Sequence, residues 1–284
     1  MKLNQVAWLS DYTLEDRPGG CQETNQVMIN AGKELGLNIE TVRPKDCENW
    51  ELDKFKEYKL IIINNLTLFP AKTLNYIIDN CKYIRYEHDY ASLDRLKEIP
   101  KLFDNSVANI FLSPLHRNQF IKRVRLEYKK IHLQPSPVLG FKSLDIEREK
   151  DLIVYAGLLS YGKGLRNVVD FMNRNKDLRL EVYSWNHADY IHEFNTTNIK
   201  FIGAKKNEEL IEVYNKANYF IHMPDWQEPF GRAVMEAYYS GCNLLLNNKL
   251  GCRSYDWDWT NHDEMIERNN NHANDFWDFI SKFL

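Results

Sequence analysis

The chain alternates short apolar runs with longer amphipathic stretches, and this alternation constrains the fold more than any other feature. The first half holds five apolar runs that are predicted to be strands: QVAWLS, NIETVR, KLIIINN, YIRYEH and ANIFLS. The second half holds five more: DLIVYAGLL, RLEVYSW, IKFIGA, NYFIHMP and CNLLLNN. Strands that alternate with helices favour parallel sheets covered by helices on both faces. The pattern therefore predicts an α/β protein.

Amphipathic stretches separate the runs and predict the helices. Residues 24–36 carry apolar side chains at helical spacing, and Gly36 is a stop signal. Further helices are predicted near 164–175, 207–217 and 232–240, and the final ANDFWDFISKFL has the pattern of an amphipathic helix. The order of elements favours doubly wound sheets, in which ligands bind at the carboxyl ends of strands.

The length of 284 residues exceeds one typical domain and suits two small ones. Segment 134–151, QPSPVLGFKSLDIEREKD, contains two prolines, a glycine and mixed charge, so it is the predicted seam. We expect two Rossmann-like doubly wound domains facing a central cleft. Their predicted limits are 1–140 and 141–265, followed by a C-terminal helix at 266–284.

Composition narrows the class of protein. The hydrophobic content of 44% supports real cores, and the formal net charge of −3 argues against bulk affinity for nucleic acid. The five cysteines are scattered and form no C-x-x-C pair, which fits a reducing compartment. The N-terminus lacks the apolar core of a signal peptide, and no apolar run reaches transmembrane length. A soluble, cytoplasmic protein is expected.

The segment PDWQEPFGRAVMEAYYSG, residues 224–241, places two acids around a helix start. Pro229 disfavours the helical conformation for Glu228, so Glu228 is expected in the loop. The helix follows over 232–240, with Glu236 near its second turn. A helix N-terminus attracts phosphate, and carboxylates accept hydrogen bonds from pairs of hydroxyls. The segment predicts a site for a polyhydroxylated ligand that carries a phosphate.

Two isolated glutamates would more simply be solvated surface residues beside a turn. Pro229, Gly231 and a helix start stand at fixed offsets directly after a predicted strand, and this combination favours the site.

The segment EPFGRAVME resembles the E-x7-E motif of retaining nucleotide-sugar glycosyltransferases with the GT-B fold, glycosyltransferase family 4 in particular. YAGLLSYGKGLRNVVDFM, residues 155–172, is similar to that family's strand–loop–helix with G-R-L-x-x-x-K-G. The family's β-α-β segment resembles IKFIGAKKNEELIEVYNKANYFIHMP. Its Gly-Gly turn and first helix resemble DRPGGCQETNQVMINAGKELG, and its segment with the cleft histidine resembles YEHDY. The resemblance covers most of the chain and is strongest over 153–251.

The resemblance implies a role for each matching position. Glu228 would lie by the donor sugar, Glu236 would bind the nucleotide ribose, and Lys163 would neutralise the diphosphate. The catalytic candidates are Glu228 and His88, which would reach the transferred sugar. The remaining donor-binding candidates are the backbone at Phe230 and Gly231, and Gly19 and Gly20 in the N-terminal turn. Taken alone, Lys163 is more simply a solvated lysine and His88 a structural histidine; in register with the other motifs both gain weight.

One departure from the family concerns the diphosphate. The family has Arg where this chain has Leu158, so one cation is missing. Arg232, just inside the helix, or Arg166 in KGLR could substitute; alternatively, donor binding is weak or lost.

Two other signals carry less weight. Asp256 and Asp258 form a D-x-D, which holds a metal in a different glycosyltransferase fold, but here the pattern is predicted to be structural or a surface loop. Segment 116–130, HRNQFIKRVRLEYKK, is basic, with Phe120, Val124 and Tyr128 at helical spacing. A solvated helix face is the simplest interpretation; the sharper ones are a peripheral membrane contact or phosphate contacts to nucleic acid.

The resemblance implies a retaining transferase that moves a sugar from a nucleoside-diphosphate sugar to a hydroxyl of a glycan, a lipid-linked or another acceptor. The donor would bind the C-terminal half and the acceptor the N-terminal half, where a final helix would cross back. No metal or other cofactor is expected. The alternatives are a non-catalytic module that binds a nucleotide or glycan, an epimerase or hydrolase of nucleotide sugars, and a transferase acting on a modified nucleic-acid base.

Overall fold

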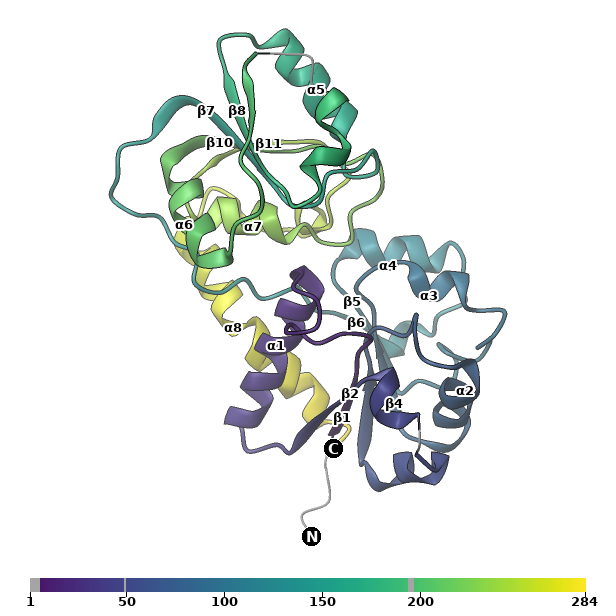
Figure 1. The fold of residues 1–284 in the computed structure, drawn as a ribbon. Helices are drawn as coiled ribbons and strands as arrows, with labels where there is room; N and C mark the ends of the chain where they lie inside the picture. Colours follow the sequence, from purple (N-terminus) through teal and green to yellow (C-terminus); the bar gives the residue numbers. More distant parts are fainter. Residues whose placement is uncertain (1–5, 49, 194–196) are drawn as a thin grey trace. The chain divides into compact units, whose positions relative to one another are not determined.

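The computed structural model describes residues 6–48, 50–193 and 197–284. The chain divides into two compact units: unit 1 contains Met1–Pro137 and Arg268–Leu284, and unit 2 contains Val138–Glu267. The first division falls within the predicted seam, and the boundaries expected from the sequence were 140/141 and 265/266. Each unit has its own parallel sheet with helices on both faces, which confirms the predicted α/β class (Figure 1).

Unit 1 is built on six parallel strands in the order β2-β1-β3-β4-β5-β6. The strands are β1 (Val6–Leu9), β2 (Ile39–Val42), β3 (Leu60–Ile63), β4 (Tyr83–Tyr86), β5 (Ala108–Phe111) and β6 (Ile131–Leu133). The helices are α1 (Gly20–Glu34), α2 (Ala71–Asn80), α3 (Ala91–Asp94), α4 (Pro114–Ile121) and most of α8 (His262–Ser281). Strand order reverses between β1 and β3, because β2 lies on one side of β1 and all later strands lie on the other.

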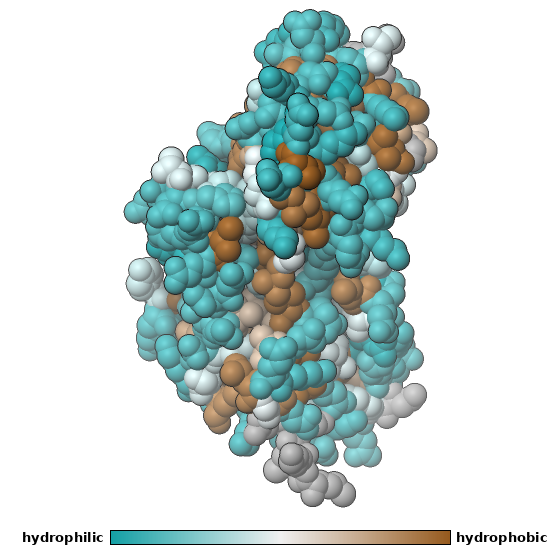
Figure 2. Space-filling view, turned by 90° about the vertical axis from the view of Figure 1, so that its left-hand side faces the viewer, coloured by the Kyte–Doolittle hydropathy of each residue, from teal (hydrophilic) through white to brown (hydrophobic). Residues whose placement is uncertain are grey.

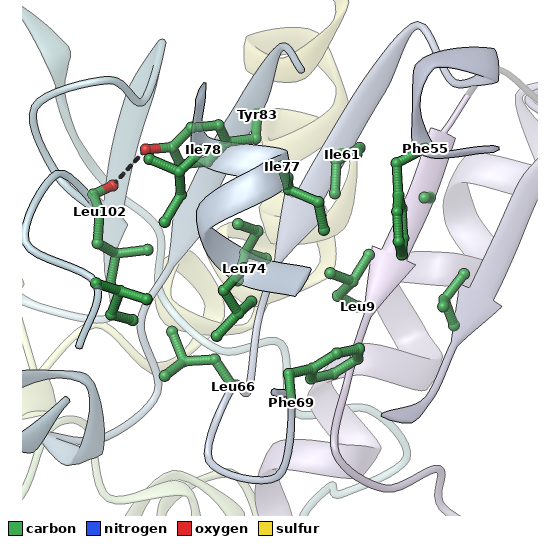
Figure 3. Packing of buried hydrophobic residues seen from close by; sticks show 14 of the residues in the cluster. Leu9, Phe55, Ile61, Leu66, Phe69, Leu74, Ile77, Ile78, Tyr83 and Leu102 are labelled. Atoms are coloured by element: carbon green, nitrogen blue, oxygen red, sulfur yellow. Dashed lines mark hydrogen bonds between the residues drawn. The ribbon is translucent and has the colours of Figure 1, made fainter. Parts of the chain in front are cut away.

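The core of unit 1 explains why its strands are apolar throughout. β1, β3, β4 and β5 are buried along their whole length, as expected for central strands covered on both faces. On one face, Leu9 and Ile61 pack with Leu74 and Ile77 of α2 (Figure 3). At the edge of this cluster the hydroxyl of Tyr83 donates a hydrogen bond of 2.7 Å to the carbonyl of Leu102, so its polar atom is satisfied inside the core.

Helix α8 covers the other face of this sheet with aromatic side chains. Phe276 lies 5.8 Å from the ring of Trp8 and 5.4 Å from that of Tyr86. Trp277 donates from Nε1 to the carbonyl of Met28 in α1 at 2.6 Å, and Figure 1 shows the end of α8 (yellow) beside α1 (purple). Unit 1 is therefore assembled from both ends of the chain.

Unit 2 is built on five parallel strands in the order β11-β10-β7-β8-β9. The strands are β7 (Glu149–Ala156), β8 (Arg179–Tyr183), β9 (Ile199–Phe201), β10 (Ala217–His222) and β11 (Asn243–Leu246), and the helices are α5 (Leu165–Arg174), α6 (Asn207–Lys216) and α7 (Arg232–Tyr239). A core cluster joins β7, β8 and β10 to α5. Strand order reverses between β7 and β10, and this reversal is where a doubly wound sheet opens a crevice.

The prediction of a continuous helical face over 116–130 was wrong. Helix α4 ends at Ile121, and a short 3₁₀ turn follows at Tyr128–Lys130. Val124 and Leu126 both pack against the core, an alternation that extended chain provides and a helix does not. Tyr128 is 83% exposed, so it does not share an apolar face with Phe120, which is buried.

Other elements differ from the predictions in extent. Helix α1 begins at Gly20 rather than at 24, and α8 begins at His262, so the Asn-rich stretch before the final residues is helical. Helix α2 and strand β6 were not predicted. Strand β6 is only three residues long and half-buried, which leaves little periodicity to detect.

None of the described helices is both long and apolar enough to cross a membrane. The face of the molecule in Figure 2 is mainly hydrophilic, with small separate hydrophobic patches.

The contact between α8 and α1 depends on Gly32. A Cβ atom at Gly32 would lie 2.5 Å from Ile39 Cδ1 and 2.5 Å from two ring atoms of Trp277. We expect Gly32→Ala to lower the free energy of unfolding by about 1–3 kcal/mol through overpacking, although alanine favours a helix by about 1 kcal/mol. Urea denaturation measures the change.

The matched control is Glu34→Ala, an exposed position in the same helix. It should change the free energy of unfolding by less than about 0.5 kcal/mol. A Gly32→Ala protein as stable as the wild type would contradict this account of the contact.

Candidate functional site

Lys163 and Glu228 meet where the strand order of unit 2 reverses. Lys163 follows β7, Glu228 follows β10, and these two strands are neighbours. Lys163 Nζ lies 2.8 Å from Glu228 Oε1 and 2.6 Å from Oε2, so the ammonium contacts both carboxylate oxygens. The two side chains are 27% and 12% exposed, respectively. The structure thus brings two of the predicted site residues together at the carboxyl edge of the sheet.

The loop that carries Lys163 is held against the exit of β10. Gly164 has φ +86°, and a Cβ atom there would lie 1.8 Å from the carbonyl oxygen of Met223. Only glycine fits this left-handed position and this close approach. The backbone N–H of Asp225 donates to the carbonyl of Gly162 at 2.9 Å, and that of Lys163 donates to Ser160 Oγ at 3.0 Å. These contacts fix the position from which the lysine extends.

Glu228 has further partners that the sequence analysis missed. Trp226 donates from Nε1 to Glu228 Oε2 at 2.8 Å, and His222 Nε2 lies 3.9 Å from the same oxygen. The backbone of Glu228 is also fixed, because its N–H donates to Lys249 and its carbonyl accepts from Gly251. Trp226 and His222 both stand within six residues of Glu228 in HMPDWQE. This proximity in the sequence could have identified them as partners of Glu228.

The pKa of Glu228 is set by opposing effects. Burial raises it, but the neighbouring His222 and the positive charge of Lys163 outweigh the burial and lower the pKa to about 2. Glu228 is therefore ionised at neutral pH. In that state it accepts hydrogen bonds and does not act as a proton donor.

Glu236 lies one helical turn inside α7 and is buried. It accepts a hydrogen bond of 3.4 Å from the hydroxyl of Tyr214, and its Oε1 lies 3.5 Å from Arg232 Nη2. Arg232, a predicted substitute for the missing cation, thus contacts the second acid of the motif. Phe230 is buried, and Gly231, at φ +98°, is the N-cap residue immediately before α7.

Arg166 and Leu158 flank the lysine loop. The guanidinium of Arg166 lies over the ring of Tyr161 at 4.5 Å, and the side chain is exposed on the first turn of α5. The side chain of Leu158 is also exposed, and its carbonyl accepts a hydrogen bond of 2.8 Å from the Tyr155 hydroxyl. Arg166 thus contacts Tyr161, and Leu158 faces solvent.

Three predicted site residues belong to unit 1. His88 follows β4 and is half-buried, with its ring 4.4 Å from that of Tyr86. Gly19 immediately precedes α1 in an extended conformation, and Gly20 is the first residue of that helix. A Cβ atom at Gly19 would lie 3.0 Å from the flexible amide of Gln22, so the backbone itself does not require glycine there.

Next to His88, Glu87 is fully buried. Its Oε1 lies 2.5 Å from Arg85 Nε, and burial raises its pKa to about 7 despite the positive charge of Arg85. Asn25 and Asn64 exchange hydrogen bonds of 3.0 Å and 2.9 Å, where the strand order of unit 1 reverses. These groups meet only through contacts between residues that are far apart in the sequence or through burial, so no local motif marks them.

The D-x-D acids lie in a loop, and Asp258 accepts hydrogen bonds from the N–H and hydroxyl of Thr260 at 2.9 Å and 2.6 Å. Within the part of the chain that the structure describes, no group of three or more His, Cys, Asp or Glu side chains is placed to hold a metal ion.

Residues 140–273 match the model of the family described as glycosyl transferases group 1. The match includes Lys163, Glu228 and Glu236 and spans nearly all of unit 2. Residues 140–273 are therefore similar to the glycosyltransferase domains that this family describes. A comparison of the sequence with curated proteins finds no significant match.

Several solved structures have a similar fold. Sucrose-phosphate synthase from Thermosynechococcus elongatus is 14% identical at a TM-score of 0.69, over 95% of this chain and 90% of that one. Anabaena HepE, solved with UDP-glucose, is 13% identical at 0.65, over 96% and 90%. An alpha-glucosyltransferase solved with UDP and a 13-mer DNA is 12% identical at 0.61, over 95% and 90%. The likeness confirms the GT-B fold.

The lowered pKa of Glu228 makes a pH-dependent contribution to stability. The ionised carboxylate stabilises the fold above its ordinary pKa of 4.5, and this contribution is lost as pH falls towards about 2. We expect the difference in unfolding free energy between the wild type and Glu228→Gln to shrink by about 2 kcal/mol from pH 6 to pH 3. Urea denaturation at both pH values measures it.

Lys163→Met provides the control, because it removes one of the charges that lower this pKa. In that background the effect of Glu228→Gln should vary less with pH. A difference that stays constant from pH 6 to pH 3 in the wild-type background would refute the assignment.

Proposed function

We propose that this chain transfers a sugar from a nucleoside-diphosphate sugar to an acceptor hydroxyl, with retention of the anomeric configuration and without a metal. The observation that carries the proposal is the Lys163–Glu228 pair at the strand-order reversal of a glycosyl transferases group 1 domain. A nucleotide-sugar donor is supported by the Anabaena HepE structure of similar fold, which was solved with UDP-glucose.

The diphosphate is proposed to bind between Lys163 and the N-terminus of α7. The first turn of a helix has N–H groups without intrahelical partners and roughly half a positive charge, which favour an anion. Gly231 presents this turn directly after the loop that holds Glu228. Lys163 contacts Glu228 now, and an ammonium has three donors, so it can contact a phosphate oxygen at the same time.

The two carboxylates are proposed to hold the two sugar rings of the donor. Glu228 is ionised at neutral pH, so it accepts hydrogen bonds from hydroxyls of the transferred sugar. Glu236 is proposed to accept from the ribose, and it is oriented by Tyr214 and Arg232. Hydrogen bonds to a charged acceptor stabilise a complex by roughly 1.5–3 kcal/mol each.

In the transfer step, the bond between the sugar's anomeric carbon and the diphosphate oxygen breaks, and a bond to the acceptor oxygen forms on the same face. The acceptor proton passes to the departing diphosphate oxygen. Charge develops on that oxygen as it leaves, and the fixed cation Lys163 stabilises it. Glu228 acts in this scheme through position and charge, and His88 is proposed to contact the transferred sugar from unit 1.

The acceptor is proposed to be a hydroxyl of a glycan, a lipid-linked sugar or a similar compound, bound by unit 1. The alpha-glucosyltransferase with DNA raises a nucleic-acid acceptor as an alternative. The exposed basic residues Lys122, Arg123 and Arg125 would supply phosphate contacts. However, they precede β6 and so lie at the amino ends of the strands, whereas His88 follows a carboxyl end. The placement of these basic residues therefore favours a glycan or a similar hydroxyl compound as the acceptor, rather than contacts of this basic segment with nucleic acid or a membrane.

Lys163→Ala should weaken binding of the donor roughly 10- to 100-fold, since a charge-assisted contact to the diphosphate is lost. Calorimetry with UDP-, GDP-, ADP- and TDP-sugars, without added metal, measures the affinity. The matched control is Lys216→Ala, which removes a lysine of the same unit immediately before β10, at the opposite end of the sheet, where it pairs with Glu149.

Equal affinity of the wild type and Lys163→Ala would remove Lys163 from the donor site. Donor binding without turnover on any hydroxyl acceptor would favour the non-catalytic module. Leu158, which stands where the family has Arg, would then be the residue to test as the cause. Turnover that needs no acceptor would favour an epimerase or hydrolase.

Retention and metal independence are tested on the transfer product. With an α-linked donor, proton NMR of the first product should show an α linkage, and the rate should be unchanged in excess EDTA. A β-linked product would contradict retention, and activity lost in EDTA and restored by Mg²⁺ would contradict metal independence.

A further inference from the structure

Three neighbouring strands of unit 2 each end in an exposed apolar side chain. Leu158 follows β7 and is 41% exposed, Trp185 follows β8 and is 70% exposed, and Ile202 follows β9 and is 36% exposed. A single exposed leucine needs no explanation. Three in a row at the carboxyl edge, beside the Lys163–Glu228 pair, form an apolar rim next to a charged site.

The loop under Trp185 is fixed by hydrogen bonds of a buried amide. Asn186 Nδ2 donates to the carbonyl of Leu159 at 2.8 Å, and its Oδ1 accepts from the N–H of Leu159 at 3.0 Å and from Ser184 Oγ at 2.7 Å. Trp185 therefore stands between two buried residues, Ser184 and Asn186, with its own indole in solvent. An exposed aromatic ring on a fixed backbone loses little conformational freedom when a ligand stacks on it.

The same amide joins the end of β8 to the loop that carries Lys163. Leu159 belongs to the segment that leads to Lys163, and Ile202 is tied to β8 by its N–H, which donates to the carbonyl of Val182 at 3.0 Å. The carboxyl edge thus runs in one direction from Glu228 through Lys163 to Trp185. Neighbouring strands are about 4.8 Å apart, so β8 lies roughly 10 Å from β10 along the sheet.

We propose that Trp185 stacks on the base of the donor nucleotide, with Leu158 and Ile202 against the edges of the base. This inference rests on the proposed function, which places the sugar at Glu228 and the diphosphate at Lys163. A diphosphate and ribose then carry the base along the edge towards β8. Every base has a π face, so stacking on Trp185 contributes affinity without choosing the base. Leu158, where a cation is missing, belongs to this apolar rim.

Trp185→Ala should weaken binding of a nucleoside diphosphate roughly 5- to 100-fold, the range for a lost base–aromatic stack. Trp185→Phe should lose less affinity for the nucleoside diphosphate, because the smaller phenyl ring can still stack on the base. Calorimetry with UDP, GDP and ADP measures the affinity, and inorganic pyrophosphate, which has no base, should bind the wild type and Trp185→Ala equally. The matched control is Tyr128→Ala, an exposed aromatic residue of unit 1 that should leave all affinities unchanged.

The outcomes separate this inference from the proposed function. If the wild type binds none of the nucleoside diphosphates, both fail. If the wild type binds one and Trp185→Ala binds it as tightly, only the base-stacking role is overturned. Equal losses for pyrophosphate and the nucleotide in Trp185→Ala would also overturn it, because they would show damage to the loop of Lys163 rather than a lost stack.

Discussion

The reversal of strand order between β7 and β10 decides where unit 2 can act. Connections from the two strands leave on opposite sides of the sheet, so their carboxyl ends stay uncovered. The chain uses this opening by bringing the lysine loop against the exit of β10, an approach that Gly164 permits because it has no Cβ. Lys163 and Glu228 then meet, and Trp226 and His222 complete the surroundings of the carboxylate.

Half-buried ion pairs are weak evidence for stability, because desolvation offsets much of the attraction between the charges. The Lys163–Glu228 pair is better understood as a source of charged groups for binding a ligand. His222 and the positive charge of Lys163 lower the pKa of Glu228, so the carboxylate at the edge of the sheet is ionised before any ligand arrives. The Arg232–Glu236 contact repeats this arrangement inside α7, with Tyr214 as an additional donor.

Ten of the eleven described strands were located from the sequence, because apolar runs between amphipathic stretches have few other solutions. Strand β6, which is short and half-buried, was missed. Helix α4 was predicted to extend too far, because Phe120, Val124 and Tyr128 have helical spacing in the sequence, whereas in the structure Val124 and Leu126 are the residues that pack against the core.

For the site, Pro229 and Gly231 in EPFG indicated the loop position of Glu228, whereas Lys163 was indicated by the resemblance of KG to the family's motif. Trp226 and His222 stand close to Glu228 in the sequence, but their spacing matches no motif, and the amide of Asn186 acts through a tertiary contact with Leu159.

Helix α8 has a consequence for how the protein is made. Its final turns supply Phe276 and Trp277 to the core of unit 1, while the strands of that unit come from the first half of the chain. During synthesis, the N-terminal sheet therefore emerges long before the residues that cover one of its faces. Unit 2 has all its strands available earlier than unit 1 has its last helix. The half that begins first at the ribosome is thus the half that finishes folding last, and its uncovered face is exposed to chaperones in the interval.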